Sequence, residues 1–186
     1  MSEETKSIRT MFDYIQFDRV MSERLRTFPD LVGHNEILRL DDTDLSISTF
    51  LTFFEDILPN AIVHSSLTEF VAHLEYASET ELSLLEVLKR RGWLESGKTA
   101  QETDSVFKTT YLDSQTKDDI EALATCVFSG LTYGYVFIDW PEEQLVVYPH
   151  KRAGFGLIAK KGTVGHQLAK KFLDTLDNHR FKVVYS

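Results

Sequence analysis

The chain has 186 residues, of which 42% are hydrophobic, and its 29 Asp and Glu outnumber its 20 Lys and Arg, leaving a net charge of −9. Its 13 Phe, seven Tyr and two Trp exclude a disordered chain, because large apolar groups in this number can bury enough surface to fold. The single Cys126 excludes an internal disulfide, and no apolar run approaches the ~20 residues that span a bilayer. We therefore expect a cytoplasmic globular protein without a secretory signal or a membrane contact.

The first half of the chain carries helical patterns. Apolar residues at helical spacing predict a long helix over about residues 3–26 and a second helix over about 42–58. Between these two helices, residues 36–40 indicate a short strand. Two capping boxes, Ser66 to Glu69 and Ser78 to Glu81, each place a hydroxyl three residues before a glutamate and predict two further helices. We therefore expect a helical N-terminal half.

Strand patterns begin after residues 95–105, a polar segment without periodicity that is typical of a linker. In chain order we expect a strand at 106–112, a helix through 120–127, strands at 132–140, 144–150 and 154–160, a helix through 168–176 and a strand at 180–186. This order is close to the ferredoxin-like, split βαβ arrangement. The predicted fold class is therefore α+β, with a helical N-terminal half (residues 1–94) packed on a C-terminal mixed or antiparallel sheet (106–186).

The two halves are expected to form one cooperative domain over residues 1–186. The strands at 132–140 and 144–150 are apolar on both faces, so both faces of the sheet need cover. The two helices of the second half can cover one face. We expect the helices of the first half to cover the other, because a unit of about 80 residues buries only a modest core by itself.

Charge is divided unevenly along the chain. Residues 1–145 hold 12 Lys or Arg and 27 Asp or Glu, a net −15, whereas residues 146–186 hold eight and two, a net +6. One interpretation is internal complementarity, in which the basic end of the chain packs near the acidic helices. The other is a surface of one sign, which favours a partner of the opposite sign. The preferred hypothesis is a small non-catalytic binding protein, such as an immunity or inhibitor protein, whose acidic surface neutralises a basic, nucleic-acid-acting protein. Its candidate contact residues are Asp41, Asp42, Asp44, Glu55, Asp56, Glu75, Glu79 and Glu81.

The sequence lacks motifs for catalysis and for metal binding. Its six histidines have no partner at the spacing of a metal site, and it contains no HExxH pattern, no Walker loop and no GxSxG elbow. Acid clusters at 41–44 and 118–121 lie where helices are expected to begin, and there carboxylates favour the helix dipole. We therefore expect no catalytic residue, no metal and no cofactor, and the sequence disfavours an enzyme.

A basic segment, residues 149–172, offers the main alternative, because it holds four glycines, six Lys or Arg and no acid. Its portion from Lys151 to Gly156 is similar to the loop with which N-acetyltransferases hold the pyrophosphate of acetyl-CoA. That resemblance implies an acyl-CoA- or nucleotide-dependent transferase with its ligand at 151–166. The glycines here precede a strand rather than a helix, which favours a turn or a bulge. The candidate anion-binding residues are Lys151, Arg152, Lys160, Lys161 and Thr163, the last of which is also placed to cap the following helix.

The same segment allows an RNA-binding hypothesis. Residues 154–156, Gly-Phe-Gly, resemble the centre of the RNA-recognition motif, whose aromatic residues stack on bases. The resemblance implies that Phe155, together with Tyr135, forms a stacking platform. Leu157 and Lys160 stand where that motif carries two further aromatics, and the acidic remainder of the chain disfavours phosphate binding.

Overall fold

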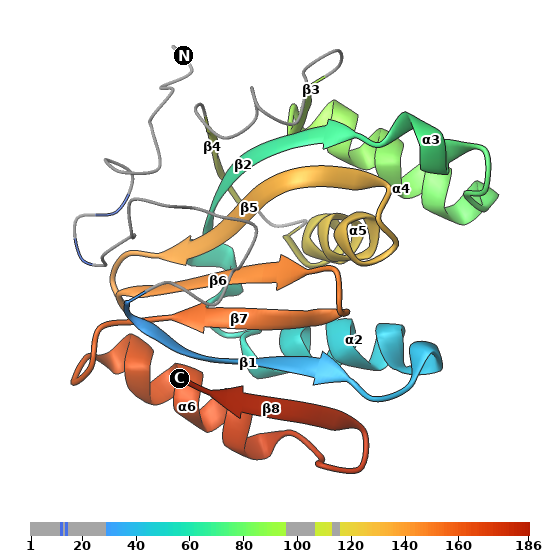
Figure 1. Ribbon diagram of the computed structural model, residues 1–186. Helices are drawn as coiled ribbons and strands as arrows, with labels where there is room; N and C mark the ends of the chain where they lie inside the picture. Colours follow the sequence, from blue (N-terminus) through green and yellow to red (C-terminus); the bar gives the residue numbers. More distant parts are fainter. Residues whose placement is uncertain (1–11, 13, 15–28, 96–106, 113–115) are drawn as a thin grey trace.

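The computed structural model describes Phe12, Tyr14 and residues 29–95, 107–112 and 116–186 (Figure 1). Within these residues one sheet contains β1 (Leu31–Ile37), β2 (Ile62–Glu69), β3 (Leu94–Glu95), β4 (Lys108–Tyr111), β5 (Thr132–Trp140), β6 (Leu145–His150), β7 (Gly154–Ile158) and β8 (Phe181–Tyr185). The strand order is β3-β2-β5-β6-β7-β1-β8, and β4 pairs with β2 beside β3. All of these pairs are antiparallel except β2 with β3.

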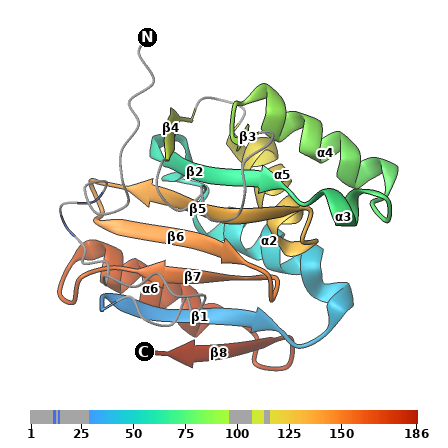
Figure 2. The same ribbon diagram turned by 45° about the horizontal axis from the view of Figure 1, so that its top comes forward.

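The described helices are α2 (Thr43–Phe53), α3 (Val71–Leu74), α4 (Glu79–Arg90), α5 (Thr116–Phe128) and α6 (Val164–Thr175), with 3-10 turns at Leu40–Asp42 and Leu58–Asn60. Helices α2, α4, α5 and α6 lie on one face of the sheet, as the two views in Figures 1 and 2 show. Helix α5 contacts both α2 and α4, and α6 contacts β1, β6 and β7. The described part of the chain therefore consists of a helical layer on a sheet.

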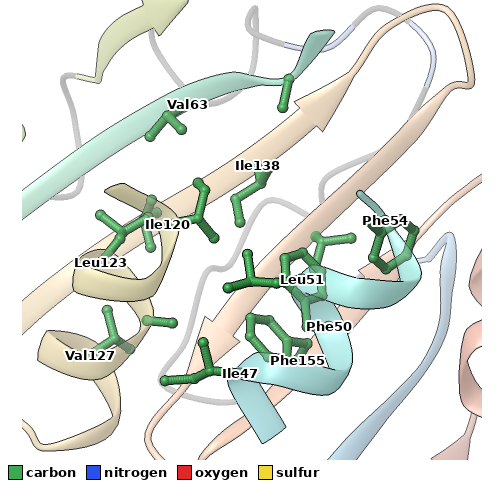
Figure 3. Close-up of a cluster of buried hydrophobic side chains, with 14 of the residues drawn as sticks. Ile47, Phe50, Leu51, Phe54, Val63, Ile120, Leu123, Val127, Ile138 and Phe155 are labelled. Carbon is green, nitrogen blue, oxygen red and sulfur yellow. The ribbon is translucent and has the colours of Figure 1, made fainter. Parts of the chain in front are cut away.

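The main apolar cluster lies between the helical layer and the sheet. Figure 3 shows Phe50 of α2 and Phe54, the residue after α2, among side chains from α5 and from the strands. Phe54 stacks on Trp140 of β5 with 5.3 Å between the ring centroids, and the Trp140 indole N–H donates a 2.9 Å hydrogen bond to the Ile57 carbonyl oxygen. Burying one large apolar side chain contributes about 1.5–3 kcal/mol. These aromatic contacts therefore fix α2 firmly on the sheet.

The opposite face of the sheet carries a second, smaller apolar cluster. Its members are Phe12, Leu31, Phe107, Phe137, Val146, Tyr148 and Ile158. Among the described residues no helix contributes to this cluster, so the expectation of helices on both faces is wrong for this part of the chain. The reason is that the first half places β1 and β2 in the sheet itself, although the capping box at Ser66 predicts a helix that begins within β2.

The capping box at Ser66 to Glu69 does not begin a helix, and the helix predicted here starts only at Val71, as the short α3. The capping-box residues belong to β2, which pairs with β5 along its whole length from Ile62 to Glu69. Pairing on both sides satisfies the backbone hydrogen bonds of a strand, and Ser and Thr also fit a pleated surface when neighbouring strands cover them. The long-range pairing of β2 therefore overrides the local capping signal.

Strand β1 begins at Leu31, earlier than the short strand expected at residues 36–40. Its residue His34 is polar yet buried, so the strand shows no clear apolar alternation in the sequence. With β1 and β2 in the sheet, a helical N-terminal half is not confirmed. The helix expected over residues 3–26 and the linker at 95–105 lie outside the described residues, apart from single positions.

The other predicted elements are confirmed. In the capping box of α4 the Ser78 hydroxyl accepts the Glu81 N–H at 3.2 Å, and the Glu81 carboxylate accepts the Ser78 N–H at 2.8 Å. The Thr163 hydroxyl caps α6 by accepting the His166 N–H at 3.2 Å. The fold class is α+β with a predominantly antiparallel sheet, and the split βαβ order is not confirmed, because β1 lies between β7 and β8.

Candidate functional site

The acidic residues predicted to contact a partner come from a segment without positive charge. Residues 41–88 contain ten Asp and Glu and no Lys or Arg. This segment includes α2, β2, α3 and most of α4. Any cation that compensates one of these acids must therefore come from another part of the chain, and the structure shows which acids meet such a cation.

Four of the eight candidate acids are exposed and make no ion pair within the described part of the chain. They are Asp44, Asp56, Glu75 and Glu79. Asp44 lies in the first turn of α2 and Glu79 in the first turn of α4. The partial positive charge at a helix N-terminus stabilises carboxylates at such positions. These four carboxylates keep a negative charge that can attract a cationic partner.

Asp42, by contrast, is buried and belongs to the fold. The Arg180 guanidinium donates its Nε–H to Asp42 Oδ2 at 2.8 Å and a second N–H to the other carboxylate oxygen. These hydrogen bonds from Arg180 lower the pKa of Asp42 below its ordinary value. The prediction that Asp42 contacts a partner is therefore corrected: its carboxylate joins the segment before α2 to the residue before β8.

The three remaining candidates are held by partners within the chain. Asp41 and Glu55 each form an ion pair, and exposed pairs of this kind contribute at most about 1 kcal/mol to stability. The Glu81 carboxylate keeps its charge but is held in a capping box by the neutral Ser78. The contacts are Asp41 with Arg39 at 3.3 Å, Glu55 with Lys117 at 3.1 Å, and Glu81 with Ser78 in the capping box.

Strand direction divides the uncompensated acids into two groups. Strands β1 and β2 run in the same direction, because four antiparallel steps separate them in the sheet. The segments that follow them, which lead to α2 and α3, therefore lie at the same end of the sheet (Figure 2). Asp44, Glu75 and Glu79 lie at this end. Neighbouring strands are ~4.8 Å apart, so the four steps between β1 and β2 place these two strands roughly 19 Å from each other. Asp56 follows the far end of α2.

The five candidate anion-binding residues do not form one site. Lys151 and Arg152 precede β7, whereas Lys160, Lys161 and Thr163 follow it. An extended strand of this length spans roughly 16 Å, so the two groups cannot reach one phosphate. Arg152 also donates to the Glu36 carboxylate at 3.1 Å, and the Thr163 hydroxyl caps α6.

The two aromatic residues of the RNA-binding hypothesis lie on opposite faces of the sheet. Phe155 is fully buried beneath the helical layer, where it stacks on Phe50. Tyr135 packs against the second cluster, with its ring parallel to that of Phe137. Because no base can reach Phe155, the stacking platform implied by the Gly-Phe-Gly resemblance is not present.

A series of hydrogen bonds on the second face of the sheet was not predicted from the sequence patterns. Nδ1 of the His64 imidazole lies 3.0 Å from the Thr109 hydroxyl oxygen, and Nε2 lies 3.1 Å from an oxygen of the Asp139 carboxylate. The Tyr14 hydroxyl donates to the other Asp139 oxygen. These residues come from four separate segments, and 75 residues separate His64 from Asp139. No spacing rule could have revealed them.

The Asp139 carboxylate, the His64 imidazole and the Thr109 hydroxyl follow one another in a single hydrogen-bonded series. The same order activates nucleophiles in hydrolases. Here, however, the Phe12 ring packs edge-on against the imidazole at 5.2 Å, and Tyr14 binds the second carboxylate oxygen. These contacts thus connect β2, β4 and β5 with Phe12 and Tyr14.

A second polar cluster on this face surrounds His150. The Glu36 carboxylate accepts from Arg152 at 3.1 Å and lies 3.3 Å from Nε2 of His34. His150 Nε2 lies 3.0 Å from the Asn35 carbonyl oxygen. Burial, aided by the neighbouring His34, lowers the pKa of His150 to about 4. The His150 ring is therefore neutral at pH 7 and acts as a buried hydrogen-bond donor.

Within the described residues no group of three or more His, Cys, Asp or Glu side chains is arranged to hold a metal ion. No helix there has the length and apolar character to cross a membrane. Comparison of the chain with protein families, curated proteins and solved structures finds no match. The class of protein is therefore defined by its fold: an α+β protein whose antiparallel sheet carries helices on one face.

Proposed function

We propose that this protein is a non-catalytic binding protein that captures a basic protein partner through its acidic helical side. The observation that carries the proposal is the segment 41–88, with ten acids and no Lys or Arg. Four of these acids, Asp44, Asp56, Glu75 and Glu79, are exposed and form no ion pair with another described residue. Charge of one sign steers an oppositely charged partner and raises its association rate. A protein that acts on nucleic acid presents such a cationic surface. Covering that surface would inhibit it, as an immunity protein does.

The helical side is suited to recognition because its charges are held on a rigid support. Phe50 and Leu51 lie on the buried face of α2, and Leu85 and Leu88 lie on the buried face of α4. The capping box at Ser78 fixes the first turn of α4, next to Glu79. Acids on an ordered support lose little conformational entropy when a partner binds. The arrangement is therefore suited to binding a partner.

Affinity capture from the source cells with the immobilised chain tests this function. The variant neutralises the acids at one end of the sheet, and its control neutralises an equal number of exposed acids elsewhere. The variant is Asp44→Asn/Glu75→Gln/Glu79→Gln, and the control is Asp118→Asn/Glu121→Gln/Glu142→Gln. We expect wild type and control to retain basic proteins that elute as salt rises, and the variant to lose them. We also expect the purified partner to lose its activity on nucleic acid when the chain is added.

The proposal fails if the variant retains the same proteins as wild type, or if the retained proteins are acidic. Retention that does not change between low and high salt would equally contradict it, because screening weakens attraction between exposed charges. A partner that is bound but keeps full activity would limit the function to binding and remove the inhibitory role.

A further inference from the structure

Apolar side chains gather at the corner of the molecule where β2 leads into α3 and α4. Four of the nine large hydrophobic residues exposed within the described ranges lie there: Phe70, Val71, Tyr76 and Leu82, which we call the α3 corner. Val71 is 72% exposed and Tyr76 is 81% exposed. Figure 2 shows α3 and the start of α4 at one end of the sheet, beyond the end of β2. Grouped apolar exposure of this kind marks contact with another molecule.

The α3 corner is held in place by the turn between α5 and β5. The Phe70 N–H donates to the Leu131 carbonyl oxygen at 2.8 Å, and His73 Nδ1 lies 3.0 Å from the Gly130 carbonyl oxygen. The Phe70 ring contacts His73 edge-on at 4.3 Å and Tyr133 at 5.8 Å. Because the backbone and one aromatic ring are already fixed, a partner that binds here orders few additional groups.

Charge around the α3 corner is negative. Glu75 and Glu79 lie between the residues of the α3 corner in the sequence and are exposed, and the segment 41–88 contains no Lys or Arg. The first cation after that segment, Lys89, is engaged by Glu69 at 2.7 Å and by Glu86 at 2.9 Å. Protein interfaces commonly combine an aromatic and apolar centre with a charged rim. The α3 corner has both parts.

We propose that the α3 corner docks a segment of the basic partner that presents apolar side chains flanked by Lys or Arg. This inference rests on the proposed function and adds the place and the chemistry of contact. Val71 and Tyr76 act as the apolar anchors, and Glu75 and Glu79 attract the flanking cations. The negative rim opposes an anionic membrane and a second copy of the chain, since both carry charge of the same sign.

A short amphipathic helical peptide made of Leu and Lys serves as the probe. A peptide of equal charge with Ser in place of each Leu is its comparator. Fluorescence anisotropy with labelled peptides gives the Kd for the full chain, and amide chemical shifts in NMR locate the contact. We expect the Leu/Lys peptide to bind more tightly than the Ser/Lys peptide and to shift amides within residues 70–82.

The matched substitutions are Tyr76→Ala and Tyr111→Ala, because both tyrosines are exposed and only Tyr76 belongs to the α3 corner. We expect Tyr76→Ala to weaken binding of the Leu/Lys peptide by about tenfold and Tyr111→Ala to leave it unchanged. Glu75→Gln/Glu79→Gln should reduce the dependence of Kd on salt. Circular dichroism of each variant checks that the fold is retained.

Equal binding by wild type and Tyr76→Ala, or amide shifts confined to other segments, overturns docking at the α3 corner. The proposed function fails separately, when the acid-neutralised variant still captures basic proteins from cells. Binding to phosphatidylcholine vesicles that Tyr76→Ala abolishes would assign the corner to a membrane instead. Self-association that Tyr76→Ala abolishes would assign it to a second copy of the chain. Either result replaces the inference.

Discussion

The ring of Phe155 lies parallel to the ring of Phe50, with 4.1 Å between the centroids and 14° between the planes. This contact joins β7 to α2 in the main apolar cluster, and Phe128 of α5 meets Phe155 edge-on at 5.4 Å. The Gly-Phe-Gly segment is therefore a packing element. Its phenyl ring fills the helical side of the sheet, and its glycines leave space on the other side.

Truncating Phe155 should destabilise the fold strongly. Phe155→Ala removes a fully buried ring between α2 and α5, so we expect it to lower the free energy of unfolding by about 3–5 kcal/mol. Urea denaturation followed by circular dichroism measures this loss. Phe155→Leu, which keeps most of the apolar volume, should lose less. A loss below about 1 kcal/mol for Phe155→Ala would contradict the assigned packing.

Gly156 should tolerate no side chain while Tyr148 is present. A Cβ atom at Gly156 would meet the Tyr148 ring at 2.0 Å, so Gly156→Ala forces the tyrosine out of its place. We expect a loss of about 1–3 kcal/mol in the free energy of unfolding. In a Tyr148→Ala background the same substitution should cost much less, because the colliding ring is gone. Additive losses in this double-mutant cycle would argue against the contact.

Stability should fall as the pH falls from about 6.5 to 4, because of His150. Its folded pKa is about 4, against 6.5 for an unperturbed histidine, because of burial and the nearby charges of His34 and Arg152. Between these values the unfolded state binds the proton and the folded state does not, so acid favours unfolding. We expect this residue to contribute a loss of about 2–3 kcal/mol near pH 4.5 relative to pH 7.

His150→Gln is the control, since its side-chain N–H can still reach the Asn35 carbonyl oxygen and has no titratable proton in this range. The neighbouring Glu36 also has a lowered pKa, because Arg152 and Lys182 outweigh the effect of burial, and this acts in the same direction at lower pH. The difference between wild type and His150→Gln therefore isolates the histidine. If the stability of the two proteins changed with pH in parallel across this range, His150 would not be the source of the pH dependence.

Asp42 and Asp44 should respond to substitution in opposite ways. Asp42→Asn breaks the ion pair with Arg180 and should lower Tm while leaving partner capture unchanged. Asp44→Asn removes an exposed, uncompensated carboxylate and should weaken capture with a smaller change in Tm. Thermal unfolding and affinity capture of both variants give the comparison. The same pattern of effects for both variants would contradict the division of acids into fold residues and contact residues.

The two halves of the chain should unfold as one unit even after cleavage. Strand β2 from the first half pairs with β5 from the second, and β1 lies between β7 and β8. Limited proteolysis within residues 95–105 should therefore give two fragments that stay together in gel filtration and melt in one transition. Fragments that separate, each with its own sharp thermal transition, would show that the single-domain prediction fails.

Elements with strong local signals are predictable from the sequence because the relevant interactions lie within a few residues. The capping box at Ser78 acts over three residues, and the turn at Pro141 separates two strongly apolar strands. The same type of pattern at Ser66 misleads, because pairing with β5 supplies the hydrogen bonds that a cap would otherwise satisfy. Strand β1 is hidden for a related reason, since its buried His34 finds polar partners only in the folded sheet.

Local patterns establish the α+β class, most of the helices and strands after residue 78, and the acidic character of residues 41–88. Long-range contacts settle which of those acids stay uncompensated. Asp42 and Asp44 stand two positions apart, yet only Asp42 receives Arg180 from the far end of the chain. Long-range contacts also bring His64 to Asp139 and turn Phe155 toward α2. Burial and pairing of this kind depend on distances in space, which the spacing of residues along the chain does not encode.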